Sequence, residues 1–321
     1  FNGTASPGSS AVATISRNGD LIHKCYIVID VKAGQALTTK AAHNLIESVE
    51  LEIGGQQIDK QYGDWMSMWN ELSLSADKQD GYNSMVTVAS GTGKIYIPLQ
   101  FYFCTNPGLA LPLIALQYHE VRIKVKFGGS GNTQFDAGNA KLWVDYVYLD
   151  TDERRRMAQS SHEFLITQLQ ADGGNTAKSG GDVARLNFNH PVKELVWCYD
   201  TKGLGEQGNL RQLHSDATHK LTLNGHDRAA PREGKYFTHV QPYQHHTRIP
   251  TGNTIGVYSF ALKPEESQPS GSCNFSRIDN AQLCTKIASS VSSPAETLKI
   301  FATNWNVLRI MSGMGGLAYS N

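Results

Sequence analysis

Strict alternation of apolar and polar side chains recurs along the chain and limits its fold more than any other feature. Residues 119–127 separate into an apolar row and a charged row, the latter formed by Glu120, Arg122, Lys124 and Lys126. Residues 95–103 show the same alternation, with isoleucine, leucine and phenylalanine at every second position. Because successive side chains of a strand point to opposite faces of a sheet, both segments are predicted to be half-buried antiparallel strands.

Further β-rich segments follow at intervals and are separated by residues typical of turns. They are residues 142–149, 192–199, 220–223, 255–262 and 298–310. Asn106-Pro107-Gly108 and Pro269-Ser270-Gly271 are turn sequences of this kind. The repeated pattern of short strands and turns predicts an all-β fold.

Two short helices are expected to interrupt the strands. Trp65, Met68, Trp69 and Leu72 have helical spacing behind Asp64, so we expect a helix whose aromatic face packs in the core. Residues 150–157 begin with acidic and continue with basic side chains, which matches the helix dipole. Asp150 and the glutamate three residues later have capping-box spacing, and we interpret this segment as a linker helix at mid-chain.

A faint internal repeat suggests that two similar domains stand in tandem. Residues 51–55, followed by Tyr62-Gly63, resemble residues 221–225, followed by Gly234 and Tyr236, about half the chain length later. A length of 321 residues also suits about two domains at roughly 150 residues each. We therefore expect domains over residues 1–150 and 162–321, joined by a linker helix over residues 151–161.

Charge and cysteine content exclude several classes of protein. Lysine plus arginine and aspartate plus glutamate both total 29, so a net charge of zero disfavours direct nucleic-acid binding. Charged residues make up 18%, against an ordinary value of about 25%, so a neutral polar surface suited to protein contacts is expected. Five cysteines without a CxxC pair predict neither a disulfide framework nor a zinc knuckle. The longest apolar run, residues 109–116, is too short to span a membrane.

Two glycine-rich segments resemble nucleotide-binding motifs but lack the necessary context. Residues 203–208 spell GxGxxG, with Asp227 as the acid about twenty residues on. Three residues separate this motif from the preceding strand, and only residues 209–219 remain for a helix, so we interpret it as a flexible loop. Residues 91–94 resemble the end of a phosphate-binding loop. However, Val88 stands where that motif needs its first glycine, and Ile95 stands where it needs a hydroxyl side chain, so we interpret the segment as a hairpin loop.

Histidines are the remaining candidates for metal chemistry. His239, His245 and His246, with His219 and His226 nearby, could supply imidazole ligands to zinc. Their spacing matches no known zinc motif, so we interpret them as surface or interface histidines and expect neither a metal nor a cofactor. No nucleophile motif is present, so no catalytic residue is predicted and the chain is not expected to be an enzyme.

Two sequons give the only predicted modification sites. Asn2-Gly3-Thr4 and Asn274-Phe275-Ser276 make Asn2 and Asn274 candidate glycosylation sites.

Several long sequence strings resemble a known family. They are residues 15–21, 52–56, 62–65, 106–121, 150–156, 188–195, 241–246, 259–265, 274–280 and 308–318. Together they resemble the major capsid proteins of nucleocytoplasmic large DNA viruses, most closely those of the algal and giant-virus branch. The resemblance covers nearly the whole chain.

This resemblance implies a double jelly roll, that is, two tandem eight-stranded jelly-roll sandwiches with short helical insertions. It implies a homotrimer with a pseudo-hexagonal outline, made late in infection and assembled in the host cytoplasm, that tiles an icosahedral capsid. The implied partners are other copies, neighbouring capsomers, minor capsid and penton proteins, and inner-membrane proteins beneath the shell, with no direct nucleic-acid contact. No cofactor is implied.

Two departures and two alternatives accompany this expectation. Family members carry a segment before the string at residues 1–20, so we expect the chain to start inside a longer product, which affects the first strand of the first jelly roll. Loops near residues 128–138 and 173–182 also look short. The alternatives are a minor jelly-roll capsid protein and a glycan-binding module for host attachment.

Overall fold

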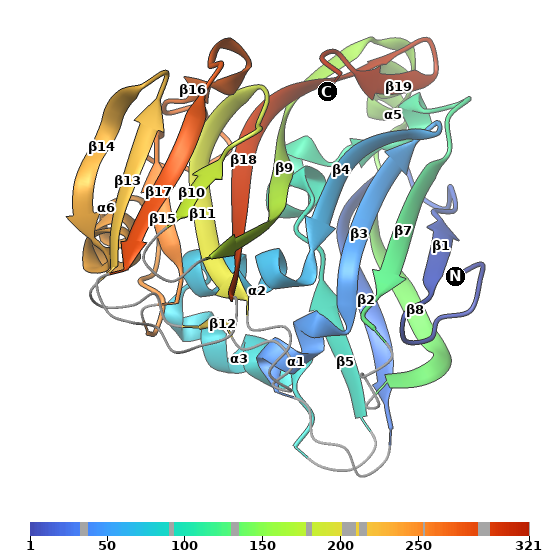
Figure 1. Ribbon diagram of the computed structural model, residues 1–321. Coiled ribbons are helices and arrows are strands. Elements are labelled where there is room, and N and C mark those ends of the chain that lie inside the picture. Colours follow the sequence, from blue (N-terminus) through green and yellow to red (C-terminus); the bar gives the residue numbers. More distant parts are fainter. Residues whose placement is uncertain are drawn as a thin grey trace. The chain divides into compact units, whose positions relative to one another are not determined.

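The computed structural model describes most of the chain and divides it into two compact units (Figure 1). The described residues are 1–32, 38–89, 93–129, 135–177, 182–200, 210–211, 217–252, 254–287 and 296–320. The first unit comprises Phe1–Ser67, Asp77–Gln168 and Asn306–Asn321, and the second comprises Met68–Ala76 and Leu169–Trp305. Within the described ranges, no helix is long and apolar enough to cross a membrane.

Two antiparallel sheets form the framework of the first unit. One has the order β1 (Ser10–Thr14), β7 (Val121–Phe127), β3 (Ile46–Ile53), β4 (Gln56–Tyr62). In the other, β2 (Leu21–Val31) pairs with β5 (Gly93–Pro98), β6 (Leu111–Pro112) and β8 (Phe135–Val147). The same unit carries the helical segments α1 (Thr39–Asn44), α3 (Ala76–Val86), α4 (Tyr102–Thr105), η1 (Pro107–Leu109), η2 (Leu113–Ala115) and α5 (Thr151–Gln159).

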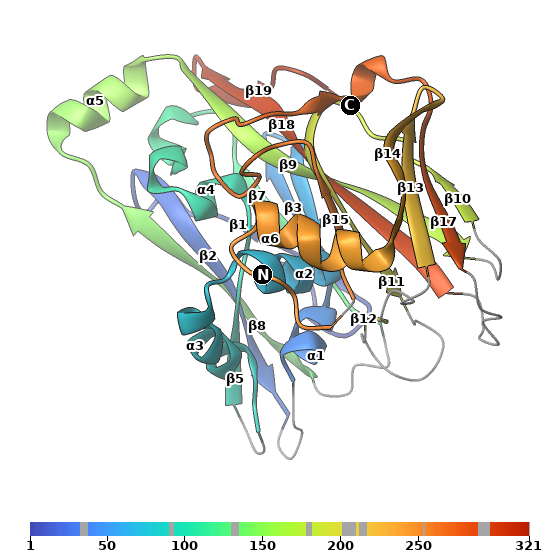
Figure 2. The same cartoon turned by 90° about the vertical axis from the view of Figure 1, so that its left-hand side faces the viewer.

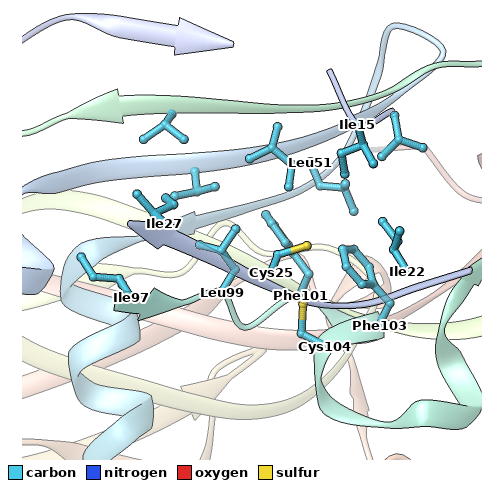
Figure 3. Close-up of a cluster of buried hydrophobic side chains, with 14 of the residues drawn as sticks. Ile15, Ile22, Cys25, Ile27, Leu51, Ile97, Leu99, Phe101, Phe103 and Cys104 are labelled. Atoms are coloured by element: carbon cyan, nitrogen blue, oxygen red, sulfur yellow. The ribbon is translucent and has the colours of Figure 1, made fainter. Parts of the chain in front are cut away.

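The apolar rows of these strands form the core of the first unit. Ile27 on β2, Leu51 on β3 and Ile97 on β5 are fully buried in one cluster, which Figure 3 shows together with Cys25 and Cys104. A hydrogen bond to Cys104, together with burial, raises the pKa of the Cys25 thiol, so this side chain stays uncharged in the core. The alternation seen in the sequence thus places the apolar face of each strand inside the unit.

The second unit is built on two further sheets. One has the order β10 (Asp182–Arg185), β17 (Ala281–Ile287), β13 (Ala217–Leu223), β14 (His226–Glu233). The other has the order β12 (Leu210–Arg211), β11 (Pro191–Asp200), β18 (Glu296–Met311), β19 (Met314–Leu317), with β15 (Gly256–Ser259) and β16 (Cys273–Asn274) on β11 and β9 (His162–Ala177) on β18. Of this sheet, β19, residues 162–168 of β9 and residues 306–311 of β18 belong to the first unit. Its helical segments include the end of α2 (Gly63–Ser73), a π-helical turn η3 (Tyr236–Val240), α6 (Gln241–His245) and η4 (Phe275–Arg277).

Trp197 occupies the centre of the second core. Its ring contacts those of Phe237 and His219 at centroid distances of 5.4 and 5.7 Å, and all three side chains are buried. A Cβ atom at Gly256 would lie 2.3 Å from the indole, so only glycine fits beside it. The all-β prediction is therefore confirmed, with each unit packed around its own core.

The internal repeat corresponds to the same local structure in both units. Gly54-Gly55 connects β3 to β4 with φ values of 56° and 86°, and Asn224-Gly225 connects β13 to β14 with 50° and 80°. Positive φ at both central positions is the geometry of a tight type I′ hairpin, which glycine and asparagine favour. In each unit a helical segment follows the hairpin, beginning at Gly63 or Gly234.

The segment after β5 departs from the predicted strand. Residues 95–103 were expected to be extended, but β5 ends at Pro98, and Tyr102 and Phe103 belong to α4. Phe101 and Phe103 nevertheless stack at 5.9 Å and are both buried. Two apolar side chains at every second position suit a strand or a short buried turn, so periodicity could not distinguish them here.

The two predicted helices are present, but one predicted cap is absent. Trp65, Met68 and Leu72 of α2 are buried as expected. At the start of α5 the main-chain oxygen of Asp150 accepts from the Arg154 N–H at 2.8 Å, while the Asp150 side chain makes no capping hydrogen bond, so the capping-box prediction is wrong. None of the residues of α5 is buried, and Figure 2 shows the helix projecting beyond β8 and β9, the strands that it connects.

Gly63→Ala is expected to destabilise the first unit by about 1–3 kcal/mol, because the added Cβ would lie 2.3 Å from the carbonyl oxygens of His43 and Ile46. Backbone atoms cannot move aside as a flexible side chain can. Gly81→Ala in α3 is the matched control, since no heavy atom lies within 4 Å of its Cβ position. Helix propensity favours that control by roughly 0.5–1 kcal/mol. Urea unfolding of both variants measures the difference, and equal stability would contradict the clash.

Candidate functional site

Four charged side chains of the second unit, three of them buried and one partly buried, lie next to one another. Lys193 and Glu194 are consecutive on β11, His246 follows α6, and Glu265 lies in the segment after β15. Lys193 is 4% exposed, Glu194 is fully buried, and the side chain of His246 has no exposed surface. We call these four residues the charge cluster.

A β-bulge positions the first two members. The register between β11 and β18 shifts between Val192 and Glu194, and the main-chain oxygen of Lys193 accepts N–H groups from Phe260 and Ala261 at 2.8 and 3.1 Å. A bulge adds one residue to a strand and redirects its side chains. Two consecutive charged residues are thereby held inside the unit.

His246 lies between the two carboxylates. Its Nε2 is 2.9 Å from Glu194 Oε2, at ion-pair distance without the angles of a hydrogen bond, and its Nδ1 is 2.9 Å from Glu265 Oε1 with hydrogen-bond geometry. Glu265 also accepts from the N–H and hydroxyl of Thr247 at 3.0 and 2.5 Å. The rings of Trp69 and His246 meet edge to face at a centroid distance of 6.1 Å. The imidazole therefore joins β11 to the segment after β15.

Burial alone would lower the pKa of His246, but Glu194 and Glu265 outweigh it and raise the pKa to about 9. Lys193 shows the opposite balance, since burial lowers its pKa to about 8 against the attraction of the two glutamates. Its Nζ donates to Pro264 O at 2.7 Å and lies 4.5 Å from the centre of the Trp305 ring. At neutral pH the two cations balance the two carboxylates.

This arrangement suits structural pairing rather than catalysis. A histidine that is already protonated at neutral pH cannot accept a proton from a substrate, and both of its ring nitrogens already face carboxylates. Metal binding requires a neutral imidazole with an available nitrogen. Over the described residues, no group of three or more histidine, cysteine, aspartate or glutamate side chains is placed to hold a metal ion.

The other candidate histidines are dispersed through the second unit. His219 lies in the core beside Thr285, and burial lowers its pKa to about 4. His226 is exposed on β14, His239 contacts Thr238, and His245 contacts the main-chain oxygen of Leu262 at 3.0 Å. The interpretation of these residues as surface or interface histidines is therefore wrong for His219 and His246. His219 is buried among the aromatic rings of the core, and His246 is buried between two carboxylates.

The nucleotide-like motifs fall largely outside the described structure. Residues 203–208 and residues 91–92 lie outside the described residues. Asp227, the acid proposed for the first motif, forms an ion pair with Lys220 at 2.7 Å across the β13–β14 hairpin.

Both candidate glycosylation sites lie on the surface. Asn2 is exposed, and its main chain pairs with Val12 on β1. Asn274 is exposed, and its side-chain oxygen accepts from the Ser276 N–H at 3.1 Å at the start of η4.

Four of the strings that carry the family resemblance meet in the first unit. Arg17 donates to the main-chain oxygen of His119 at 3.3 Å, and the Gly315 N–H lies 3.1 Å from His119 Nδ1. The Leu317 N–H donates to Gln56 Oε1 at 3.2 Å. Residues far apart in the sequence thus form one hydrogen-bonded region, so at least part of the resemblance reflects the requirements of this fold.

Family models match both halves of the chain. Residues 1–150 match the model described as major capsid protein N-terminus, and residues 153–316 match the one described as large eukaryotic DNA virus major capsid protein. Together these matches cover nearly all of the sequence.

Individual relatives agree with the family models. The chain is 51% identical to the major capsid protein of Pyramimonas orientalis virus, covering 100% of this chain and 89% of the relative. It is 41% identical to that of Paramecium bursaria Chlorella virus 1, covering 100% and 90%.

Solved structures extend the likeness to three dimensions. A chain of the PBCV-1 virus capsid superposes with a TM-score of 0.88 at 37% identity, covering 100% of this chain and 95% of the other. The Faustovirus major capsid protein gives a TM-score of 0.76 at 12% identity, covering 95% and 88%, which shows a shared fold. The double jelly-roll prediction is confirmed by these matches.

Proposed function

This chain belongs to the major capsid proteins of large eukaryotic DNA viruses, and from that premise we propose that it forms a homotrimeric, pseudo-hexagonal capsomer that tiles an icosahedral shell. Membership of the family makes it a structural component of the virion that assembles into the capsid with other copies. The observation that carries the proposal is 51% identity to a major capsid protein over the full length of the chain.

The organisation of the chain supports the trimer. The chain contains two compact β-units, each with its own core, so one chain supplies two similar building blocks. Three copies around a threefold axis supply six blocks, and a closed ring of six similar blocks has a nearly hexagonal outline. Such an outline can cover a flat shell facet with a single kind of subunit, which is the task of a major rather than a minor capsid protein.

The remaining features of the proposal follow from the family. We keep residues 1–150 and 162–321 as the two jelly rolls, with residues 151–161 as the linker, and Asn2 and Asn274 as candidate glycosylation sites. Neighbouring capsomers, minor capsid and penton proteins and inner-membrane proteins are the proposed partners, and the host cytoplasm is the proposed place of assembly. The proposed role requires no catalytic residue and no cofactor.

The native mass of the purified protein tests this proposal directly. Light scattering is expected to give roughly three times the chain mass of 35.2 kDa, and negative-stain images of the same sample are expected to show hexagonal particles. A monomer at micromolar concentration would contradict autonomous capsomer formation. A monomer that also binds glycans would favour an attachment module, and a low copy number in virions would favour a minor capsid protein.

A further inference from the structure

The two sheets of the first unit present outer faces of opposite character. On the sheet that contains β3, β4 and β7, cross-strand ion pairs join lysine to glutamate: Lys60 to Glu50 at 2.7 Å, Lys124 to Glu52 at 2.9 Å and Lys126 to Glu47 at 2.7 Å. Each charge on this ladder has a partner within its own chain. Such a face already satisfies its own charges and gains little from contact with another protein.

The outer face of the other sheet is aromatic. Ile27, Ile29 and Leu142 point into the core, so the residues that alternate with them on β2 and β8 point outward. On that side Tyr26 is paired with Trp143 of β8, and Val28 is paired with Tyr96 of β5. We call Tyr26, Val28, Tyr96 and Trp143 the aromatic face.

The rings of this face are held in position although they are accessible. Tyr96 and Trp143 meet edge to face at a centroid distance of 5.5 Å. Trp143 remains 50% exposed, whereas Val28 between the strands is only 3% exposed. A tryptophan held in this way loses little conformational freedom when it is buried, and tryptophan and tyrosine are the residues that most often dominate binding at protein interfaces.

Charged residues of both signs surround the aromatic centre. Lys94 lies 4.0 Å from Asp30 across β5 and β2, and Lys141 and Asp145 flank Trp143 on β8. An apolar centre with a polar rim is the usual anatomy of a protein interface. A rim of mixed sign does not favour a polyanion, but it accommodates a surface that also carries both signs, and this chain has a net charge of zero.

We infer that the aromatic face is covered by a second copy of this chain inside the capsomer. The inference rests on the proposed trimer and specifies one surface that holds it together. The family already establishes that copies of the chain assemble with one another. Permanent contacts between subunits are more apolar than transient ones, so between the two sheet faces the aromatic one fits the permanent contact.

Trp143→Lys tests this inference, because it places a charge at the centre of the face without altering a buried side chain. We expect the concentration at which the trimer dissociates, measured by analytical ultracentrifugation, to rise at least about tenfold. Tyr148→Lys is the matched control, since Tyr148 is an exposed aromatic residue of the same unit outside the face, at 71% exposure. This control is expected to leave the trimer intact. The conservative variant Trp143→Tyr is expected to keep most of the stability of the wild-type trimer. Thermal melting of each monomer checks folding.

Oxidative footprinting of the wild type gives a second readout. Trp143 is expected to be protected in the trimer and reactive after dilution to monomer. A wild-type trimer in which Trp143 reacts freely, or which Trp143→Lys leaves unchanged, overturns the inference while the proposed function stands. The inference is also overturned if Tyr148→Lys weakens the trimer as much as Trp143→Lys does. A wild type that is monomeric would contradict the proposed function itself, so the two failures are distinguishable.

Discussion

Glu194→Ala is expected to lower the free energy of unfolding of the second unit by about 3–5 kcal/mol. Glu194 is fully buried, its Oε2 lies 2.9 Å from His246 Nε2, and its Oε1 accepts from the Thr303 hydroxyl at 3.2 Å. Removing the carboxylate leaves a buried cluster with two cations and one anion. The cost is the penalty of that uncompensated charge, which exceeds the net contribution of the intact pair.

Glu266→Ala is the matched control for this variant. Glu266 pairs with Lys263 at 2.9 Å, but both side chains are more than half exposed, so its loss is expected to cost no more than about 0.5 kcal/mol. Urea unfolding at one fixed protein concentration compares the two variants, because association would otherwise change the apparent stability. If the two glutamate variants were equally stable, the charge cluster would contribute no more than a surface ion pair.

Local sequence patterns predicted the strands because alternation and burial have the same physical cause. Arg122, Lys124 and Lys126 of the predicted charged row lie on β7, and the two lysines pair with glutamates of β3, as a half-buried strand requires. Glu120 precedes the strand. The strand prediction was wrong around Phe101, because two buried aromatic residues two positions apart are compatible with a short helical turn as well as with a strand. Pro98 marks the point at which β5 ends.

The charge cluster could not be predicted from spacing. His246, Glu194 and Glu265 come from three separate segments, and only the fold brings them together. One signal was present, since Lys193 and Glu194 interrupt an apolar strand in which every residue from 192 to 199 is buried. Charges in such a strand must either find partners or shift their pKa, so they predict a buried partner without identifying it.

The aromatic face shows the same limit for surfaces. The sequence predicted that residues 142–149 form a strand, but an exposed Trp143 on one strand and a half-buried Tyr96 on another become one surface only through the pairing of both strands with β2. Strand order is a property of the tertiary fold, and short-range periodicity carries no information about it.

The stability of the second unit is expected to fall as the pH rises above about 6.5, because His246 loses its proton. In the folded state the pKa of His246 is about 9, against an ordinary value of 6.5, since Glu194 and Glu265 outweigh burial. Between these values the folded chain holds a proton that the unfolded chain has released, so stability is fully present below about pH 6.5 and is lost through pH 9. A shift of this size corresponds to about 3 kcal/mol.

Lys193 acts in the opposite direction at higher pH, so the histidine contribution has to be isolated. The pKa of Lys193 is about 8 in the folded state against 10.5 ordinarily, because it is buried, and its titration therefore adds stability between those values. The quantity to measure is the difference in unfolding free energy between the wild type and His246→Gln. Because both proteins contain Lys193, this difference isolates the contribution of the histidine. This difference is expected to be large at pH 6 and to shrink by about 3 kcal/mol by pH 9.5. His226→Gln is the matched control, because it makes the same substitution at an exposed position on β14. If the His246→Gln difference did not change between pH 6 and pH 9.5, the folded chain would not hold the extra proton on His246, and the ion pairing of this imidazole with Glu194 and Glu265 would be contradicted.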